Sequence, residues 1–300
     1  MQTVTLNHRS GLRKILEVFA ADIKISHSIF ALPFVGVALT ITGVTGISSL
    51  RMVKILLCMI LARSFAMGMN RYLDRHIDSE NLRTKIRALP TGKINHQAYL
   101  AVTLSCGALF IAVAASLSTV AGWLSPLLLV VLTFYSLMKK ISWLTHWYLG
   151  LCLGLAPVAA ELALFDQISM PIILVGFAVT FWTAGFDILY SLQDQAFDIE
   201  NGLHSVPAKL GHRKAIWLSR FSFLLMILCL WIAGMEIGAG IWWKVGVAVV
   251  ACILVAEHWT IRDAMVTGTS EKINLAFFNL NALVSVLFFV FALGDYYGRS

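Results

Sequence analysis

The chain has 300 residues, of which 59% are hydrophobic and only 13% are charged, and its formal net charge is +7. An ordinary globular domain is nearer to half apolar and a quarter charged, so this composition predicts a polytopic membrane protein and excludes a typical soluble domain. The basic residues stand in short segments between apolar runs and form no patch with interleaved aromatic residues. The positive charge therefore indicates membrane topology and no nucleic-acid partner.

We expect an all-α fold, a single integral-membrane domain over 1–300 in which nine transmembrane helices surround a central cavity open at the cytoplasmic side. A helix needs about 20 apolar residues to cross the hydrocarbon of a bilayer. No cleavable signal is apparent, so the first span is expected to stay in the membrane. The predicted spans are 22–46, 50–72, 97–116, 121–138, 146–165, 171–190, 215–236, 241–260 and 273–293.

The distribution of Lys and Arg predicts the orientation of these spans. With a cytoplasmic N-terminus, most of the 23 basic residues fall on the inside, and the outside loops hold only four: Arg51, Lys54, Lys244 and Arg299. Positive residues concentrate on the cytoplasmic side of membrane proteins. We therefore expect an integral membrane protein with a cytoplasmic N-terminus, an outside C-terminus, and cytoplasmic polar segments at 73–96 and 191–214.

The stretch NRYLDRHID, residues 70–78, ends the second predicted span. Asn70, Asp74 and Asp78 recur every fourth residue, so in an α-helix they line one face. A carboxylate that follows a strongly apolar run is costly unless a cation or water receives it. The motif therefore indicates a functional site at the membrane edge rather than an ordinary helix end.

A second acidic motif follows the sixth predicted span, on the same predicted side of the membrane. Asp194 and Asp198 repeat the spacing of the first motif's aspartates, and Tyr190 stands where the first motif has its asparagine. Asp187 precedes them on the same predicted helix face. A repeated acidic motif at one membrane face predicts two half-sites around one cavity.

Carboxylate and amide oxygens are ligands that Mg²⁺ prefers, and crowded carboxylates need cations to stay ionised. The candidate Mg²⁺ ligands are Asn70, Asp74, Asp78, Asp187, Asp194 and Asp198. Basic residues follow both motifs and are candidates for binding a diphosphate: Arg75, Arg83, Lys85, Arg87 and Lys209. For any single aspartate, the alternative is a solvated charge at a helix end.

Two further polar residues lie within predicted spans. Arg63 precedes Asn70 by two helical turns and lies on nearly the same face, which permits either a contact to an anionic group of a substrate or a structural pair with Glu161. His27, in KISHSIF, is a candidate contact to a polar substrate or a satisfied interior histidine.

At these residues the chain resembles the UbiA superfamily of intramembrane prenyltransferases. The signature N-x-x-x-D-R-x-x-D stands at 70–78, the R-T and P-x-G elements stand at 83–84 and 90–92, and Y-x-x-x-D-x-x-x-D stands at 190–198. KISHSIFALPF and YSLQDQAFDIENGLHSVPAKLG are similar to bacterial 4-hydroxybenzoate polyprenyltransferases. The chain departs from the family at Met69, where an Arg precedes the asparagine in other members, so a role for that Arg does not carry over.

The resemblance implies Mg²⁺-dependent transfer of a polyprenyl group from polyprenyl diphosphate to a small aromatic acceptor within the lipid bilayer, through an allylic carbocation. The expected acceptor is 4-hydroxybenzoate, in ubiquinone or menaquinone biosynthesis, and no obligate protein partner is evident. The residues expected to be catalytic are Asn70, Asp74, Asp78, Tyr190, Asp194 and Asp198.

Two alternatives remain open at this stage. In the first alternative, the acceptor is a dihydroxynaphthoate, or a haem or chlorophyll precursor, in place of 4-hydroxybenzoate. From another class, a cation- or proton-coupled transporter would place its acids near the bilayer midplane, whereas these aspartates cluster at one membrane edge.

Overall fold

The computed structural model describes residues 8–24, 32–43, 46–267 and 279–299, and over these residues its regular structure is entirely helical. The prediction of an all-α fold is confirmed. The elements are α1 (His8–Asp22), α2 (Leu32–Thr42), α3 (Ser49–Glu80), α4 (His96–Ala115), α5 (Thr119–Met138), α6 (Thr145–Phe165), α7 (Met170–Ser191), η2 (Leu192–Asp194), α8 (Gln195–Glu200), α9 (Val206–Leu210), α10 (His212–Glu236), α11 (Ile241–Thr267) and α13 (Asn281–Arg299).

Eight helices in the described part of the chain are long and apolar enough to cross a membrane. They are α3, α4, α5, α6, α7, α10, α11 and α13, and each corresponds to a predicted span. The predicted first span, 22–46, corresponds to the 11-residue helix α2, and residues 25–31 lie outside the described residues. The predicted count of nine is therefore approximate, but the chain is an integral membrane protein.

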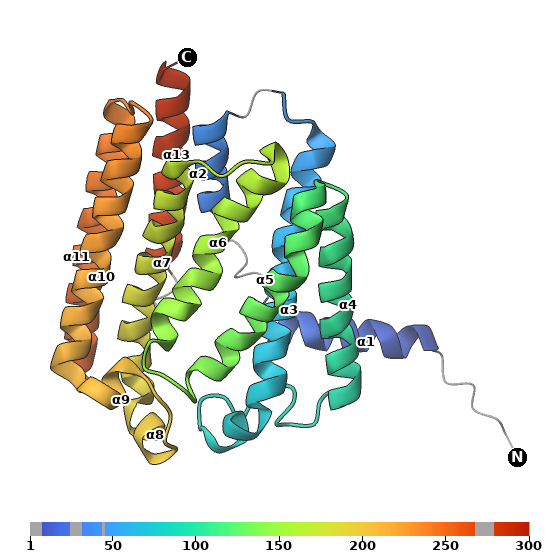
Figure 1. Cartoon of the computed structure of the whole chain (residues 1–300). Coiled ribbons are helices and arrows are strands. Elements are labelled where there is room, and N and C mark those ends of the chain that lie inside the picture. Colours follow the sequence, from blue (N-terminus) through green and yellow to red (C-terminus); the bar gives the residue numbers. More distant parts are fainter. Residues whose placement is uncertain (1–7, 25–31, 44–45, 268–278, 300) are drawn as a thin grey trace, which may run out of the picture.

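The long helices stand side by side, with α7 in the interior of the bundle (Figure 1). Small residues let α6 and α7 approach closely, because a Cβ at Gly154 would overlap the carbonyl oxygen of Gly176, and one at Gly150 would overlap that of Thr180. Small residues at this spacing are the usual means of close helix packing in membranes. The tight α6–α7 pair fixes the helix that carries Asp187.

Helix α1 was not predicted, and it lies across the bundle beside α4 (Figure 1). Phe19 and Ile23 are buried against the segment that leads into α4, and the Phe19 ring lies 4.9 Å from that of Tyr99. The Asp22 carboxylate accepts hydrogen bonds from the Tyr99 hydroxyl and the Ala88 backbone N–H, both at 2.8 Å. A helix with one apolar and one charged face suits the membrane interface.

The two segments that follow the acidic motifs lie at the same end of the bundle, where α8 and α9 are also found (Figure 1). The C-terminus lies at the opposite end, where Arg299 donates to the carbonyl oxygen of Ile237 in the turn between α10 and α11.

Candidate active site

The first acidic motif is wholly helical because α3 continues to Glu80, eight residues beyond the predicted end of the span. Asn70, Asp74 and Asp78 are all buried on one face, and Asp74 is only 1% exposed. Asn70 Nδ2 donates to Asp74 Oδ2 at 2.9 Å, whereas Asp74 Oδ1 has no hydrogen-bond partner. The first half-site therefore presents a buried carboxylate oxygen that is free to bind a cation.

The second motif is not on one continuous helix face, and this part of the prediction is wrong. Asp187 lies in α7, Asp194 ends the 3₁₀ turn η2, and Asp198 lies in the short helix α8. A 3₁₀ turn has 3.0 residues per turn instead of 3.6, so it shifts the register between Asp187 and the two later aspartates.

Arg83 joins the two motifs across the end of the bundle. Its Nη2 lies 2.5 Å from Asp194 Oδ2, its Nε donates to Asp194 Oδ1 at 3.2 Å, and its Nη1 donates to the Tyr190 hydroxyl at 3.3 Å. Two parallel bonds from a guanidinium to a carboxylate give a strong and directional contact. The segment that follows the first motif is thereby placed against the second.

Three other aspartates among the predicted ligands also have an Arg, Lys or His partner. Arg87 Nη1 lies 2.6 Å from Asp78 Oδ2, Lys139 Nζ lies 2.6 Å from Asp74 Oδ2, and His146 Nδ1 lies 2.7 Å from Asp187 Oδ2. Sequence reasoning missed Lys139 and His146 as site residues. They lie in or beside the α5–α6 connection, far along the chain from either motif, and the only sequence signal was a pair of lysines between two spans.

Among the described residues, no three His, Cys, Asp or Glu side chains are grouped closely enough to bind one metal ion. The predicted ligands do not converge because each aspartate with a basic neighbour is held toward it. The donor set still suits Mg²⁺, since it consists of carboxylate and amide oxygens and includes the unpartnered Asp74 Oδ1.

Three of the predicted diphosphate-binding residues are not brought to the motifs. Arg75 donates to the carbonyl oxygen of Tyr72 and its guanidinium lies over the Tyr72 ring, 4.7 Å from the ring centre. Lys85 and Lys209 are exposed and form no ion pair with a described aspartate. Arg75 directly follows Asp74, so it lies about 100° around the helix from that residue.

The predicted acceptor contacts have different outcomes. Arg63 lines the cavity and donates, at 3.4 Å, to the carbonyl oxygens of Ile23 and Lys24 at the end of α1. The alternative pair with Glu161 is wrong, because that carboxylate accepts from the backbone N–H and hydroxyl of Ser169, both at 2.8 Å. His27 lies outside the described residues.

A cavity of about 1190 Å³ extends from the motif end of the bundle toward the opposite end. Its polar mouth is lined by Lys24, Arg63, Arg71, Arg83, Arg87, Tyr135, Asp187 and Tyr190. Its interior is mainly apolar and reaches Leu117, Ala121 and Ile168 at the far end. The site is therefore a charged entrance leading into a long apolar chamber.

The mouth carries a concentration of positive charge. Arg71 is buried, its Nη1 donates to Asn70 Oδ1 at 3.0 Å, and its Nε has no hydrogen-bond partner. Burial, together with the charges of Arg71, Arg87 and Arg83, lowers the pKa of Lys24 from its usual value. Mutually repelling cations that line a cavity mouth are an arrangement suited to a multiply charged anion.

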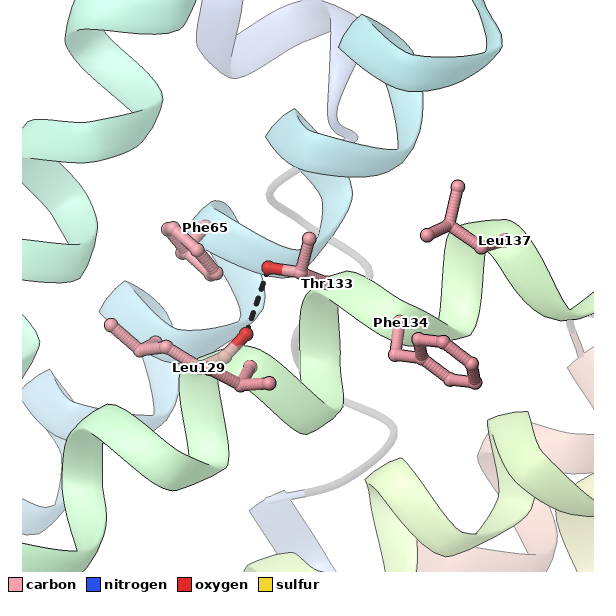
Figure 2. Close-up of a pocket in the computed structure, with 6 residues that line it drawn as sticks. Phe65, Leu129, Thr133, Phe134 and Leu137 are labelled. Carbon is pink, nitrogen blue, oxygen red and sulfur yellow. Dashed lines mark hydrogen bonds between the residues drawn. The ribbon is translucent and has the colours of Figure 1, made fainter.

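A second pocket, of about 260 Å³, lies between α3 and α5 and is bordered by Phe65, Leu129, Phe134 and Leu137 (Figure 2). Its hydroxyl group, that of Thr133, donates to the carbonyl oxygen of Leu129 at 2.8 Å. The lining thus offers no free polar group, and the pocket lacks the chemistry of a catalytic site.

These observations define an integral membrane protein with one charged site at the mouth of an apolar chamber. The model of the UbiA prenyltransferase family matches residues 31–292, and the chain belongs to that family. It is therefore a membrane-embedded prenyltransferase.

Curated relatives agree with this assignment. The 4-hydroxybenzoate octaprenyltransferase of Pseudomonas fluorescens is 27% identical over 205 residues, which are 68% of this chain and 69% of that protein. The enzyme of the same name from Burkholderia cenocepacia is 31% identical over 213 residues, 67% of this chain and 70% of that protein.

Solved structures share the fold. A UbiA homologue from Aeropyrum pernix has a TM-score of 0.79 and 28% identity, covering 90% of this chain and 98% of its own. A UbiA homologue from Archaeoglobus fulgidus, bound to GPP and Mg²⁺, has a TM-score of 0.67 and 19% identity, covering 93% of this chain and 99% of its own.

Proposed function

We propose that the chain transfers a polyprenyl group from polyprenyl diphosphate to 4-hydroxybenzoate in an Mg²⁺-dependent reaction of quinone biosynthesis. The observation that carries this proposal is the cavity, whose cationic mouth suits a diphosphate and whose apolar interior suits a long isoprenoid tail. The names of the relatives, 4-hydroxybenzoate octaprenyltransferases, support the choice of acceptor and of a long donor.

Mg²⁺ would be held by Asp74, Asp78, Asp194 and Asp198, with Asn70 and Asp187 as further ligands or supports. The GPP and Mg²⁺ bound by the Archaeoglobus fulgidus homologue support a metal-bound diphosphate in this family. When bound, Mg²⁺ neutralises charge that develops on the leaving diphosphate. The buried, unpartnered Asp74 Oδ1 is the oxygen of the first motif best prepared for this role.

The diphosphate would be bound by basic residues that now contact the aspartates. Arg83, Arg87 and Lys139 each pair with one motif carboxylate, and Arg83 and Arg87 also line the cavity. Arg71 and Lys24 add positive charge at the mouth. Their positions support a role in the binding of the leaving group.

In the reaction, the allylic C–O bond breaks and its electron pair leaves with the diphosphate. The electron-rich ring of the acceptor then forms a C–C bond to the allylic cation, and the ring loses one proton to restore its aromaticity. The apolar wall below the mouth keeps water away from the cation, which water would otherwise convert to an alcohol.

Arg63 is our candidate for the group that binds the carboxylate of the acceptor. It lines the polar mouth of the cavity, and its two hydrogen bonds to α1 carbonyl oxygens are long, at 3.4 Å. A dihydroxynaphthoate carries a carboxylate and an electron-rich ring as well, so it is the second candidate acceptor.

We place the protein in a bacterial inner membrane, with the motif end of the bundle and the N-terminus in the cytoplasm and the C-terminus outside. The basic residues around the acidic motifs support this orientation. A cytoplasmic site would give a charged diphosphate access to the mouth from water while its tail lies among the helices.

The experiment that tests the proposal is a prenyl-transfer assay in membranes containing the full chain. It offers 4-hydroxybenzoate and dihydroxynaphthoates in turn, with prenyl diphosphates of several lengths, in the presence of Mg²⁺ or of a chelator. We expect prenylated 4-hydroxybenzoate only when Mg²⁺ is present. Product from a naphthoate alone would move the assignment to the second acceptor, and product formed in the chelator would overturn the metal requirement.

A further inference from the structure

His146 is a buried histidine at the start of α6, and both of its ring nitrogens have partners. Nδ1 lies 2.7 Å from Asp187 Oδ2, and Nε2 accepts a hydrogen bond from the Val206 backbone N–H at 3.2 Å. Because a backbone N–H only donates, Nε2 carries no proton. The imidazole is therefore neutral, holds its proton on Nδ1, and donates that proton to the Asp187 carboxylate.

Asp187 differs in this respect from the three motif aspartates that form ion pairs. Asp74, Asp78 and Asp194 face a Lys or Arg, whereas Asp187 receives a hydrogen bond from a neutral ring. A neutral donor fixes the orientation of the carboxylate without cancelling its charge. Asp187 also lines the cavity, so its charge acts on whatever enters the mouth.

The other nitrogen of the same ring holds the segment that follows Asp198. Val206 is the first residue of α9 and is fully buried, with Ile188 of α7 in the same apolar cluster. Two residues earlier, the His204 backbone N–H donates to the carbonyl oxygen of Lys139 at 2.6 Å. The segment 201–210, which connects α8 to α10, is thus attached to the α5–α6 connection at two neighbouring points.

We propose that His146 is a positioning residue that holds Asp187 and the segment behind Asp198 in place for the binding of Mg²⁺. Its Nδ1–H orients Asp187, and its Nε2 attaches the segment 201–210, which leaves α8 and Asp198 little freedom to move away from the mouth. This inference rests on the proposed binding of Mg²⁺ and diphosphate. Hydrogen-bond partners of this kind, placed behind metal ligands, typically change metal affinity by roughly 10–100-fold when they are removed.

Two substitutions separate the two hydrogen bonds. His146→Asn keeps an amide donor near the position of Nδ1 but has no atom at the position of Nε2. His146→Gln reaches the position of Nε2 with an amide oxygen that accepts from Val206, but it lacks the Nδ1 donor. Because each variant retains a polar side chain of intermediate size, each keeps one of the two contacts that a buried Ala would lose.

The readouts are the Mg²⁺-dependent binding of inorganic diphosphate to the purified full chain, by calorimetry, and hydrogen exchange across residues 201–210. No acceptor or prenyl group is present, so the measurement does not depend on turnover. We expect His146→Gln to weaken Mg²⁺-dependent binding about 10–100-fold with the segment protected as in the wild type. We expect His146→Asn to weaken binding by less than about 10-fold, because Asp187 keeps its donor, and to exchange faster at 201–210 because the bond to Val206 is lost.

His258→Gln serves as the matched control, because His258 is a half-buried histidine in α11, away from both motifs, whose Nδ1 contacts the Leu254 carbonyl oxygen in its own helix and whose ring packs on Phe223. It should change neither readout. Wild-type affinity in His146→Gln, with α6 and α7 protected as before, would overturn the role of the Asp187 hydrogen bond. If the wild-type chain itself bound no diphosphate with Mg²⁺, the proposed function would fail first, and this inference with it.

Discussion

Lys139 Nζ lies 2.6 Å from Asp74 Oδ2, so an ion pair joins the end of α5 to the centre of the first acidic motif. Asp74 is 1% exposed, and Lys139 is the cation that compensates its charge in this arrangement. A buried carboxylate left without such a partner is strongly destabilising. The same pattern holds for Asp78 with Arg87 and for Asp194 with Arg83. Lys and Arg side chains of the protein itself thus compensate the charge of these three aspartates.

This pairing predicts how Mg²⁺ affects stability when Lys139 is replaced. In Lys139→Met the methylene stem is retained but Asp74 loses its partner, so the unfolding free energy without metal should fall by about 1–3 kcal/mol. Mg²⁺ supplies the missing positive charge, and it should raise the melting temperature more in Lys139→Met than in the wild type. Thermal unfolding in detergent, with and without Mg²⁺, measures both effects.

The matched control is Lys140→Met, since Lys140 is exposed and forms no ion pair with a described aspartate. It should melt like the wild type under both conditions. An equal Mg²⁺ shift in Lys139→Met, Lys140→Met and the wild type would show that Asp74 takes no part in metal binding.

Removing a motif carboxylate should abolish turnover without unfolding the protein. Asp74→Ala and Asp194→Ala each remove the two carboxylate oxygens of one proposed Mg²⁺ ligand. We expect prenyl transfer to fall by roughly 100-fold or more, which exceeds the effect of losing a hydrogen-bond partner behind a metal ligand. Asp166→Asn is the control. The Asp166 carboxylate accepts a hydrogen bond from the Ser118 hydroxyl, outside both acidic motifs, and its φ of 52° is a conformation that Asn tolerates. Transfer assays on extracted, folded protein decide the matter, and undiminished activity in either Ala variant would contradict the assignment.

Much of this architecture is visible in the sequence because membrane helices and motif faces follow from periodicity and composition. The spacing of Asn70, Asp74 and Asp78 places them on one helix face, and the basic residues place both motifs at one end of the bundle. The 3₁₀ turn that carries Asp194 was not visible, since residues 191–194 contain no Gly or Pro to mark a break. The amphipathic α1 was missed because its apolar residues do not form a continuous run.

The partners of the aspartates depend on contacts between distant parts of the chain, and one sequence does not show such contacts. Lys139 and His146 look like ordinary residues of a short connection until α5 and α6 are placed beside α3 and α7. In the same way, Arg75 looks like part of the first motif, yet the helix turns it onto Tyr72. Arg75 was predicted as a site residue because it lies within the first motif, whereas Lys139 was missed because it lies far from both motifs in the sequence.

The length of the apolar chamber predicts which donors it accepts. Ala160, in α6, lines the chamber far from the charged mouth and is 4% exposed. A Phe side chain there occupies space that the distal isoprene units of a long tail would need, and overpacking typically costs 1–3 kcal/mol. In Ala160→Phe, kcat/KM should therefore fall about 10-fold or more for long prenyl diphosphates and change little for geranyl diphosphate.

Activity with geranyl diphosphate also reports that the Ala160→Phe variant is folded. Leu151→Phe adds an aromatic ring to the same helix at an exposed position outside the cavity lining, and it should leave the length preference unchanged. An equal loss of activity with short and long donors in Ala160→Phe would contradict a tail site in this chamber.

Arg63 has a structural role and a proposed binding role, which kinetic measurements can separate. It holds the end of α1 through the carbonyl oxygens of Ile23 and Lys24, and we propose that it also binds the acceptor carboxylate. Hydrogen bonds to a charged group contribute about 1.5–3 kcal/mol, so Arg63→Met should raise the KM for 4-hydroxybenzoate by roughly 10–150-fold. The KM for the prenyl diphosphate should stay within about threefold of its wild-type value.

Phe19→Ala loosens α1 from Tyr99 without changing the charge of the cavity, so it shows what a displaced α1 does alone. If both variants change the two KM values alike, Arg63 acts only by anchoring α1, and the acceptor carboxylate is bound elsewhere.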